Sequence, residues 1–247
     1  MIVRAALLLS VAVSAGATDL SPLRSTLTAM RGTQPVSASV EVHRARKSSG
    51  RFSNNQSAGG AAFQVTVDTN GLHVTIAPAL LEAAAREAKE RETDTKKMTP
   101  TRAALDEMEV LSIAESLNYA SALMRLLNIG QVTTEQRVTW QGKPARLVTL
   151  KLTEKLPPQA TSVFNVQFAD DHLKLWLAED HTPLAAERIR KGSARFLFLR
   201  GEMNSRESWR FVRRDDRLVV AHMEASFAGS GFGQKGEGRT TQTVTLR

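Results

Sequence analysis

The stretch LKLWLAEDHTPL, residues Leu173–Leu184, decides the fold class of this chain. Its three leucines at the start alternate with a lysine and a tryptophan, and a period of two is typical of a strand with one buried face. An acidic pair and a proline follow and form a turn signal, after which a second apolar run begins. The stretch therefore predicts an antiparallel β-hairpin.

The same pattern continues on both sides of this hairpin, from Val132 to Arg247. Short runs rich in Val, Leu, Phe and Thr are separated by turn signals at Gln141–Gly142, Pro157–Pro158, Asp170–Asp171, Asp180–Pro183, Gly201–Asn204 and Asp215–Asp216. Regular spacing of this kind predicts an antiparallel meander. Further strands are expected over 36–43 and 61–67, with a mobile loop over 48–60 and a hairpin turn at Asn70–Gly71.

Helices are expected before and between these strands. Residues 78–97 are rich in Ala and Glu, and their Glu–Arg pairs four positions apart stabilise a helix. A second helix is expected from Arg102 to Leu127, because apolar residues form one stripe there: Val110, Ile113, Leu117, Ala120, Met124 and Leu127. A short helix over 21–31 precedes the first strand, with Pro22 well placed near its start.

The fold class follows from what must cover the sheet. The run from Phe196 to Leu199 is apolar on both faces, so that strand needs cover on both sides. The helices at 78–127 are the obvious cover. We expect an α+β fold in which a large, strongly curved antiparallel sheet, a half-barrel, has helices packed on its concave face. Residues 18–247 show no repeat and no linker, which predicts a single domain with a helical insertion at about 78–127.

This order of elements resembles the periplasmic lipoprotein-carrier and outer-membrane lipoprotein-sorting superfamily. The local match is Leu173–Leu184, which is similar to a hairpin of that group made of a strand, a Trp, an acidic turn, Pro-Leu and a second strand. Arg217–Ala221, after an Asp-Asp turn, is similar as well. The resemblance implies a half-open β-barrel that has a lid of helices and holds acyl chains inside. It implies no individual functional residue, because these motifs concern hairpin geometry.

Six large apolar side chains are candidates for the lining of an apolar pocket. Such a pocket would be lined by Trp176, Phe196, Phe198, Trp209 and Phe211 from the meander and by Leu117 from the helical stripe. The alternative is that these residues form an ordinary filled core, which is the more common role of such side chains. A cavity of several hundred Å³ is what a ligand carrier needs and a scaffold lacks.

No motif predicts catalysis, a cofactor or a metal. Asp170-Asp171-His172 and Glu179-Asp180-His181 look like a repeated ligand cluster, but a strand of about 30 Å separates them, so both are expected to be turns. Residues 229–236 (GSGFGQKG) lack the Gly-Lys-Ser/Thr order of a phosphate loop and are expected to form a flexible loop before a last strand over 240–246. We therefore expect no enzyme activity, no cofactor and no bound metal.

The first seventeen residues have the composition of a secretory signal peptide: Arg4, an apolar run and a small-residue site, Ala15-Gly16-Ala17. Thr18, the expected new N-terminus, is not the cysteine that lipid attachment would need. A protein that is periplasmic or secreted, and does not span the membrane, is expected. The net charge of +8 favours an anionic partner of the cell envelope over nucleic acid, which export would keep apart from the protein.

Two functions follow as hypotheses. The first is a non-enzymatic exported protein that binds a hydrophobic or amphiphilic ligand, such as a lipid, an acyl chain or a lipidated protein, in its curved sheet. The alternative is a structural or interaction protein that acts through a sheet edge or through the Arg-rich stretch Arg188–Arg217.

Overall fold

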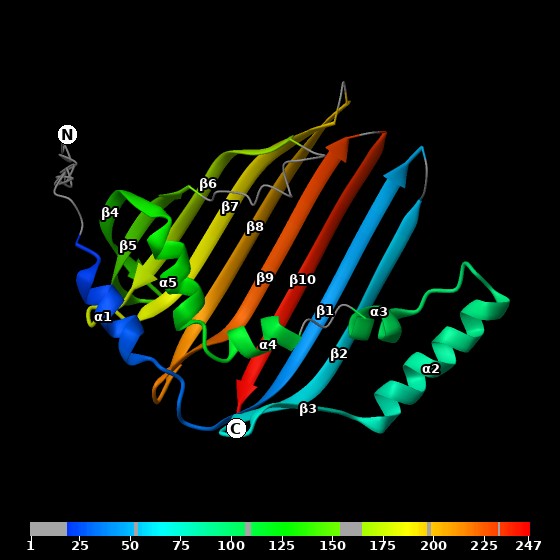
Figure 1. Cartoon of the computed structure of the whole chain (residues 1–247), viewed down its shortest axis with the longest axis horizontal. Coiled ribbons are helices and arrows are strands. Elements are labelled where there is room, and N and C mark those ends of the chain that lie inside the picture. Colours follow the sequence, from blue (N-terminus) through cyan, green and yellow to red (C-terminus); the bar gives the residue numbers. More distant parts are fainter. Residues whose placement is uncertain (1–18, 52–53, 107–109, 154–164, 197–198, 232) are drawn as a thin grey trace, which may run out of the picture.

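A computed structural model describes residues 19–51, 54–106, 110–153, 165–196, 199–231 and 233–247. Its main feature is one open, curved antiparallel sheet of ten strands in the order β3-β2-β1-β10-β9-β8-β7-β6-β5-β4 (Figure 1). The strands are β1 (Val36–Gly50), β2 (Asn55–Asp68), β3 (Gly71–Ile76), β4 (Gly130–Trp140), β5 (Lys143–Leu152), β6 (Asn165–Leu177), β7 (Pro183–Phe196), β8 (Leu199–Arg214), β9 (Arg217–Gly231) and β10 (Gln234–Leu246). The expected large antiparallel meander is confirmed.

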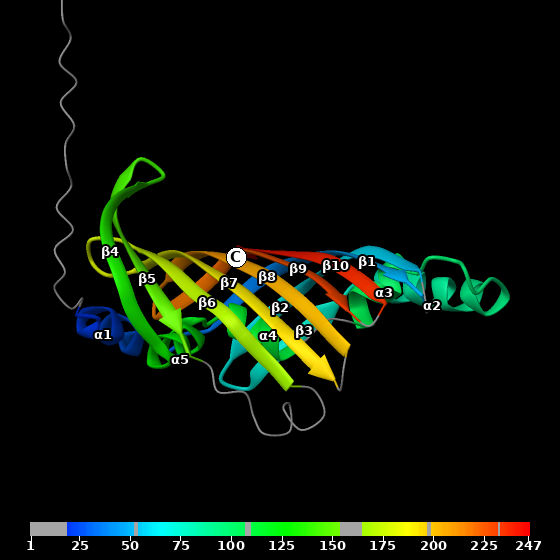
Figure 2. The same cartoon turned by 90° about the horizontal axis from the view of Figure 1, so that it is seen from above.

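Five short helices accompany the sheet in the described part of the chain: α1 (Ser21–Ala29), α2 (Pro78–Thr93), α3 (Pro100–Asp106), α4 (Val110–Ser116) and α5 (Ala120–Asn128). Helices α1, α4 and α5 lie on one face of the sheet (Figure 2). Helix α3 approaches β2 on the same face, because a Cβ at Gly59 would meet the Pro100 carbonyl oxygen at 1.9 Å. We call this side of the sheet the helix-bearing face. None of the described helices is long and apolar enough to cross a membrane.

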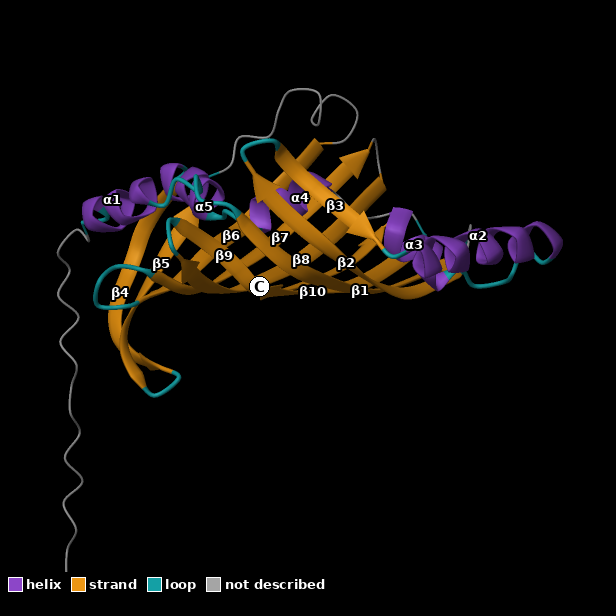
Figure 3. Cartoon of the chain, turned by 90° about the horizontal axis from the view of Figure 1, so that it is seen from below, coloured by secondary structure: helices purple, strands orange, loops and turns teal. Residues whose placement is uncertain are grey.

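The helix-bearing face holds two apolar clusters. The larger one joins α1 and α5 to strands β5, β6, β8 and β9, and Leu123, Leu150 and Leu173 are fully buried in it. The smaller one joins α4 to β1 and β2 through Ile113, Leu117 and Val40. Both clusters lie toward one end of the long strands. At the other end α3 lies against β2, at the right of Figure 3, whereas the part of the face over β8, β9 and β10 has no described helix on it (Figure 1).

The single helix expected from Arg102 to Leu127 is wrong, because the segment forms three helices. Between α4 and α5 the Tyr119 amide donates to the Leu218 carbonyl of β9 at 2.7 Å instead of continuing a helical hydrogen-bond ladder. The apolar stripe is thereby divided between the clusters. Ile113 and Leu117 enter the smaller cluster, while Leu123 and Leu127 enter the larger one.

Four turn predictions are confirmed, and the turn at Asp180–Pro183 lies between β6 and β7. Gln141 and Gly142, with φ of 49° and 80°, connect β4 to β5, and Asp215 with φ of 50° helps to connect β8 to β9. Positive φ at such positions suits the right-handed twist of a tight hairpin. The hairpin at Asn70–Gly71 joins β2 to β3, and Gly71 has φ of 114°.

Other turn and loop predictions are wrong because strands continue through them. Asp170–Asp171 lies inside β6, Gly201–Asn204 inside β8, and most of the expected loop over 48–60 inside β1 and β2. The expected loop over 229–236 is also mostly strand. These Gly-, Ser- and Asp-rich segments stay extended because each pairs with at least one neighbouring strand, which hydrogen-bonds its backbone. The Pro157–Pro158 turn lies outside the described residues.

Candidate functional site

The helix-free part of the helix-bearing face contains a groove of about 580 Å³ that crosses β8, β9, β10 and β1. Its wall residues include Met203, Phe227, Gly229, Gly236 and Arg46, and we refer to this space as the glycine groove. The strand register aligns these residues in rows across the sheet. One row runs Phe168, Gly192, Met203, Gly229, Gly236, Ser48, and the next runs Arg190, Ser205, Phe227, Gly238, Arg46, Ser57.

The floor of the groove is open because glycines replace side chains there. Gly229 and Gly231 on β9 are two residues apart, as are Gly236 and Gly238 on β10, so each pair points to the helix-bearing face. The Phe227 ring occupies the space over Gly238, where a Cβ would be 2.2 Å from the ring's Cε1. Glycine at these positions lets an apolar group approach the backbone closely.

Two large apolar side chains of this groove are solvent-exposed. Met203 is 41% exposed and Phe227 is 38% exposed, and both point to the helix-bearing face. Val212 is 40% exposed, but it lies on the opposite face, one residue beyond the buried Phe211 of the same strand. Exposed apolar side chains beside a depression are a typical feature of a ligand-binding groove.

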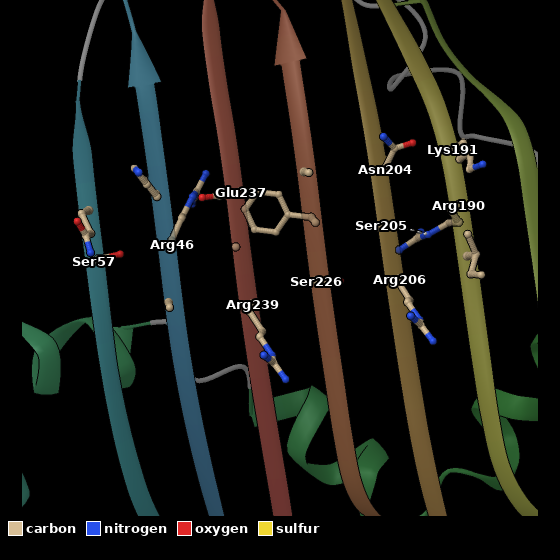
Figure 4. Close-up of a pocket in the computed structure, with 17 residues that line it drawn as sticks. Arg46, Ser57, Arg190, Lys191, Asn204, Ser205, Arg206, Ser226, Glu237 and Arg239 are labelled. Atoms are coloured by element: carbon tan, nitrogen blue, oxygen red, sulfur yellow. Dashed lines mark hydrogen bonds between the residues drawn. The ribbon is translucent and has the colours of Figure 1, made fainter.

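Cations border the apolar residues. The Arg46 guanidinium carbon is 5.6 Å from the Phe227 ring centroid, and that of Arg190 is 5.9 Å from the Phe168 ring centroid. Arg190 Nε also donates to Ser205 Oγ at 3.2 Å, as Figure 4 shows. A pocket of about 600 Å³ overlaps this region and shares Arg46 and Phe227 with the glycine groove. The arrangement joins an apolar surface to positive charge.

The residues expected to form a pocket do not converge on this groove. Leu117 is fully buried in the smaller cluster. Trp209 and Phe211 are buried in the larger cluster, where both rings contact Tyr119 at centroid distances of 5.7 and 5.4 Å. Trp176 follows the buried Leu175, so it lies on the opposite face, with its ring centroid 5.0 Å from that of Trp140.

The remaining two pocket candidates cannot be placed. Phe198 and the side chain of Phe196 lie outside the described residues. The sequence pattern did contain a signal for the groove, which is the spacing of glycines by two residues at 229, 231, 236 and 238. In a strand this spacing leaves one face without side chains. The prediction of a loop over residues 229–236 missed this meaning of the spacing.

A second cavity of about 870 Å³ lies between α5 and strands β7 and β8, and Trp209 is among its lining residues. Its polar wall includes Arg188, Glu207 and Tyr119. Arg188 makes a bidentate, buried ion pair with Asp171, with Nε–Oδ1 at 2.9 Å and Nη2–Oδ2 at 2.6 Å. Burial raises the pKa of the Tyr119 phenol, so this hydroxyl stays protonated at neutral pH.

The two acidic–histidine triplets lie apart. Asp171 points to the helix-bearing face and pairs with Arg188, while Asp170 pairs with His172 on the other face. Only the second triplet forms the expected turn, after β6, where Asp180 accepts from the Thr182 amide at 3.0 Å. Among the side chains that the structure describes, no three of His, Cys, Asp or Glu are arranged to hold a metal ion. The expectation of a protein without metal, cofactor or catalysis stays a prediction.

The chain was compared with protein-family models, with curated proteins and with solved structures. No protein-family model and no curated protein matches the chain. A similar solved structure is the crystal structure of a domain from Vibrio parahaemolyticus provisionally named as an outer membrane lipoprotein-sorting protein. The match has a TM-score of 0.35 and 9% identity, and it covers 92% of this chain and 91% of that chain.

Proposed function

We propose that this protein is a non-enzymatic, exported protein that binds a hydrophobic or amphiphilic ligand, or the lipid part of a lipidated partner, in the glycine groove. The observation that carries the proposal is that Met203 and Phe227 are exposed above a floor of glycines. We take the helix-bearing face to be the concave side of the curved sheet. A chain lying there would cover both side chains and the glycine backbone beneath them.

The energetics favour such a ligand. Fully burying an exposed Met or Phe side chain contributes about 1.5–3 kcal/mol, so covering the roughly 40% of Met203 and Phe227 that is exposed contributes about 0.6–1.2 kcal/mol each, or roughly a threefold to eightfold change in affinity. Because the floor consists of glycines, an apolar chain can contact the backbone there without clashing with side chains. The ligand then needs no cavity in the smaller cluster, where Leu117 is fully buried.

The sharpest test compares two side chains of the same strand. Met203 and Val212 are exposed to nearly the same extent, 41% and 40%, but lie on opposite faces of β8. We expect Met203→Ser to weaken binding of a fluorescent fatty-acid probe by roughly threefold to eightfold, and Val212→Ser to leave it unchanged. Wild-type protein that binds neither the probe nor a lipid from its own cell envelope would contradict the proposal.

Export is a separate part of the proposal. The composition of residues 1–17 supports a cleaved signal peptide, and residues 1–18 lie outside the described structure. We expect N-terminal sequencing of the exported protein to begin at Thr18. An uncleaved chain that remains in the cytoplasm would contradict this part and leave the groove proposal to its own test.

The alternative function, an interaction protein acting through a sheet edge, has one observation in its favour. Strand β4 ends the sheet order, so its outer backbone groups have no neighbouring strand among those described. Unpaired edges are templates for pairing with another chain. The test is Thr134→Pro in β4. If this variant no longer captures a partner protein but still binds the probe normally, the alternative function is favoured.

A further inference from the structure

We propose that the basin between the α2–α3 connection and strands β1 and β2 binds a phosphate-type anion, the headgroup of the amphiphile whose chain lies in the glycine groove. This inference rests on the proposed function and adds the chemical class of the ligand. The basin has a volume of about 630 Å³. It is lined on one side by β1 and β2 and on the other by residues 91–103.

The charges of the basin are one-sided. Of its fourteen described lining residues, four are cationic and none is acidic. The cations are Arg46, Arg91, Lys96 and Lys97. The other lining residues include several amide and hydroxyl side chains, which can donate hydrogen bonds to an oxyanion: Asn54, Asn55, Gln56, Ser57, Thr95 and Thr99. Positive charge combined with many neutral donors suits a phosphate, whose oxygens accept several hydrogen bonds at once.

Two of the basin's cations, Arg91 and Lys97, contact neighbouring side chains, whereas the side chain of Lys96 is exposed to solvent. Arg91 Nη1 donates to the buried Thr99 Oγ1 at 3.4 Å, which directs its guanidinium to the basin wall. Lys97 Nζ lies 3.3 Å from a Glu90 carboxylate oxygen that is outside the lining. The backbone amide of Lys96 donates to Asp94 Oδ1 at 3.0 Å, which fixes the turn while its ammonium group remains exposed.

The basin and the glycine groove are continuous. Arg46 and Ser48 line both, because they are neighbours of Gly238 and Gly236 in the rows that cross the sheet. Arg46 also contacts the Phe227 ring, so one residue borders the apolar and the cationic regions. An amphiphile with its chain along Met203 and Phe227 would place its headgroup beside Arg46, at the entrance of the basin.

The test uses single-chain ligands with the same tail, below their micelle concentrations: dodecyl phosphate, the neutral dodecyl maltoside, and inorganic phosphate without a tail. The basin variant is Arg91→Gln with Lys96→Gln. The matched control is Lys143→Gln with Lys151→Gln, which removes the same charge from two exposed lysines of β5 that line neither the basin nor the groove. Calorimetry measures affinity, and circular dichroism shows that each variant is folded.

We expect the basin variant to bind dodecyl phosphate about tenfold more weakly and the maltoside unchanged, with little effect of the control. An equal loss in both double variants, or no loss in either, would overturn the proposal while leaving the groove intact. Inorganic phosphate bound as tightly as dodecyl phosphate would assign the basin to free phosphate and overturn the amphiphile assignment. Basin-dependent phosphate binding without any binding of the two tailed ligands would instead contradict the groove.

Discussion

The Phe227 ring of β9 lies over Gly238 of β10, at a position where a Cβ on Gly238 would be 2.2 Å from the ring. This contact shapes the glycine groove. Because Gly238 has no side chain, the Phe227 ring can lie across β9 and β10, yet it remains 38% exposed. A large apolar side chain is thereby presented to solvent in a defined position.

Replacing Gly238 tests this contact. In Gly238→Ala the new methyl group must displace the ring, since the clash is with the end of a side chain. We expect a several-fold loss of affinity for the fatty-acid probe with a change in stability of less than about 1 kcal/mol. The control is the same Gly238→Ala change made in Phe227→Ala protein, where there is no ring to displace and the further loss of affinity should be smaller. Equal losses from Gly238→Ala in the two proteins would contradict the role of the ring.

The Asp171–Arg188 pair is expected to be a point of sensitivity in folding. Its side chains are 4% and 9% exposed, so Asp171→Ala removes the bidentate carboxylate partner of a buried guanidinium. We expect a loss of about 3–5 kcal/mol in the free energy of unfolding, measured with urea. Adding Arg188→Met should restore part of it. Arg200→Met, which breaks an exposed pair with Glu202, should cost less than about 1 kcal/mol.

Substitutions of Leu117 test whether the stability of the protein and its affinity for the ligand depend on different residues. It is fully buried in the smaller cluster and lines none of the pockets described above. We expect Leu117→Ala to lower the free energy of unfolding by about 2–5 kcal/mol and to leave probe affinity unchanged. Leu117→Asp should prevent folding. Leu81→Ala, at a side chain that is 50% exposed, is the control. A folded Leu117→Asp protein that loses only its ligand would return Leu117 to the binding site.

The α1–β1 connection depends on the ionised form of Asp216. Hydrogen bonds from the Thr33 hydroxyl and amide, each 2.6 Å long, and from the Gln34 amide lower the pKa of this carboxyl below its usual 3.8, although burial acts in the opposite direction. A lowered pKa in the folded state means that the stabilisation is fully present above the unfolded pKa. It is lost as the pH falls through the folded value.

The expected outcome is that Asp216→Asn lowers the melting temperature at about pH 7 but removes part of its decline below about pH 4. Melting curves across that range measure both effects. A variant whose acid decline is as steep as that of the wild type would show that Asp216 does not contribute to it.

The sequence by itself determined the class of the fold. Alternation at Leu173, Leu175 and Leu177 and the turns at Gln141–Gly142 and Asp215–Asp216 were sufficient to predict antiparallel hairpins, because strand period and turn geometry are local properties. The resemblance drawn from the hairpin at Leu173–Leu184 also depended on local pattern. The lengths of the strands, in contrast, are not determined by the local sequence. The Gly-, Ser- and Asp-rich ends of β1, β6, β8 and β9 are extended only because neighbouring strands pair with them.

Tertiary structure alone decided where the candidate site lies. The stripe from Val110 to Leu127 was divided when the Tyr119 amide bonded to Leu218, so Leu117 became core. The groove depends on the register that brings Phe227 over Gly238 and Met203 between Gly192 and Gly229. Register is a relation between residues far apart in the chain, set by the packing of the whole sheet. The spacing of the glycines was visible in the sequence, but the strands that give it meaning were not.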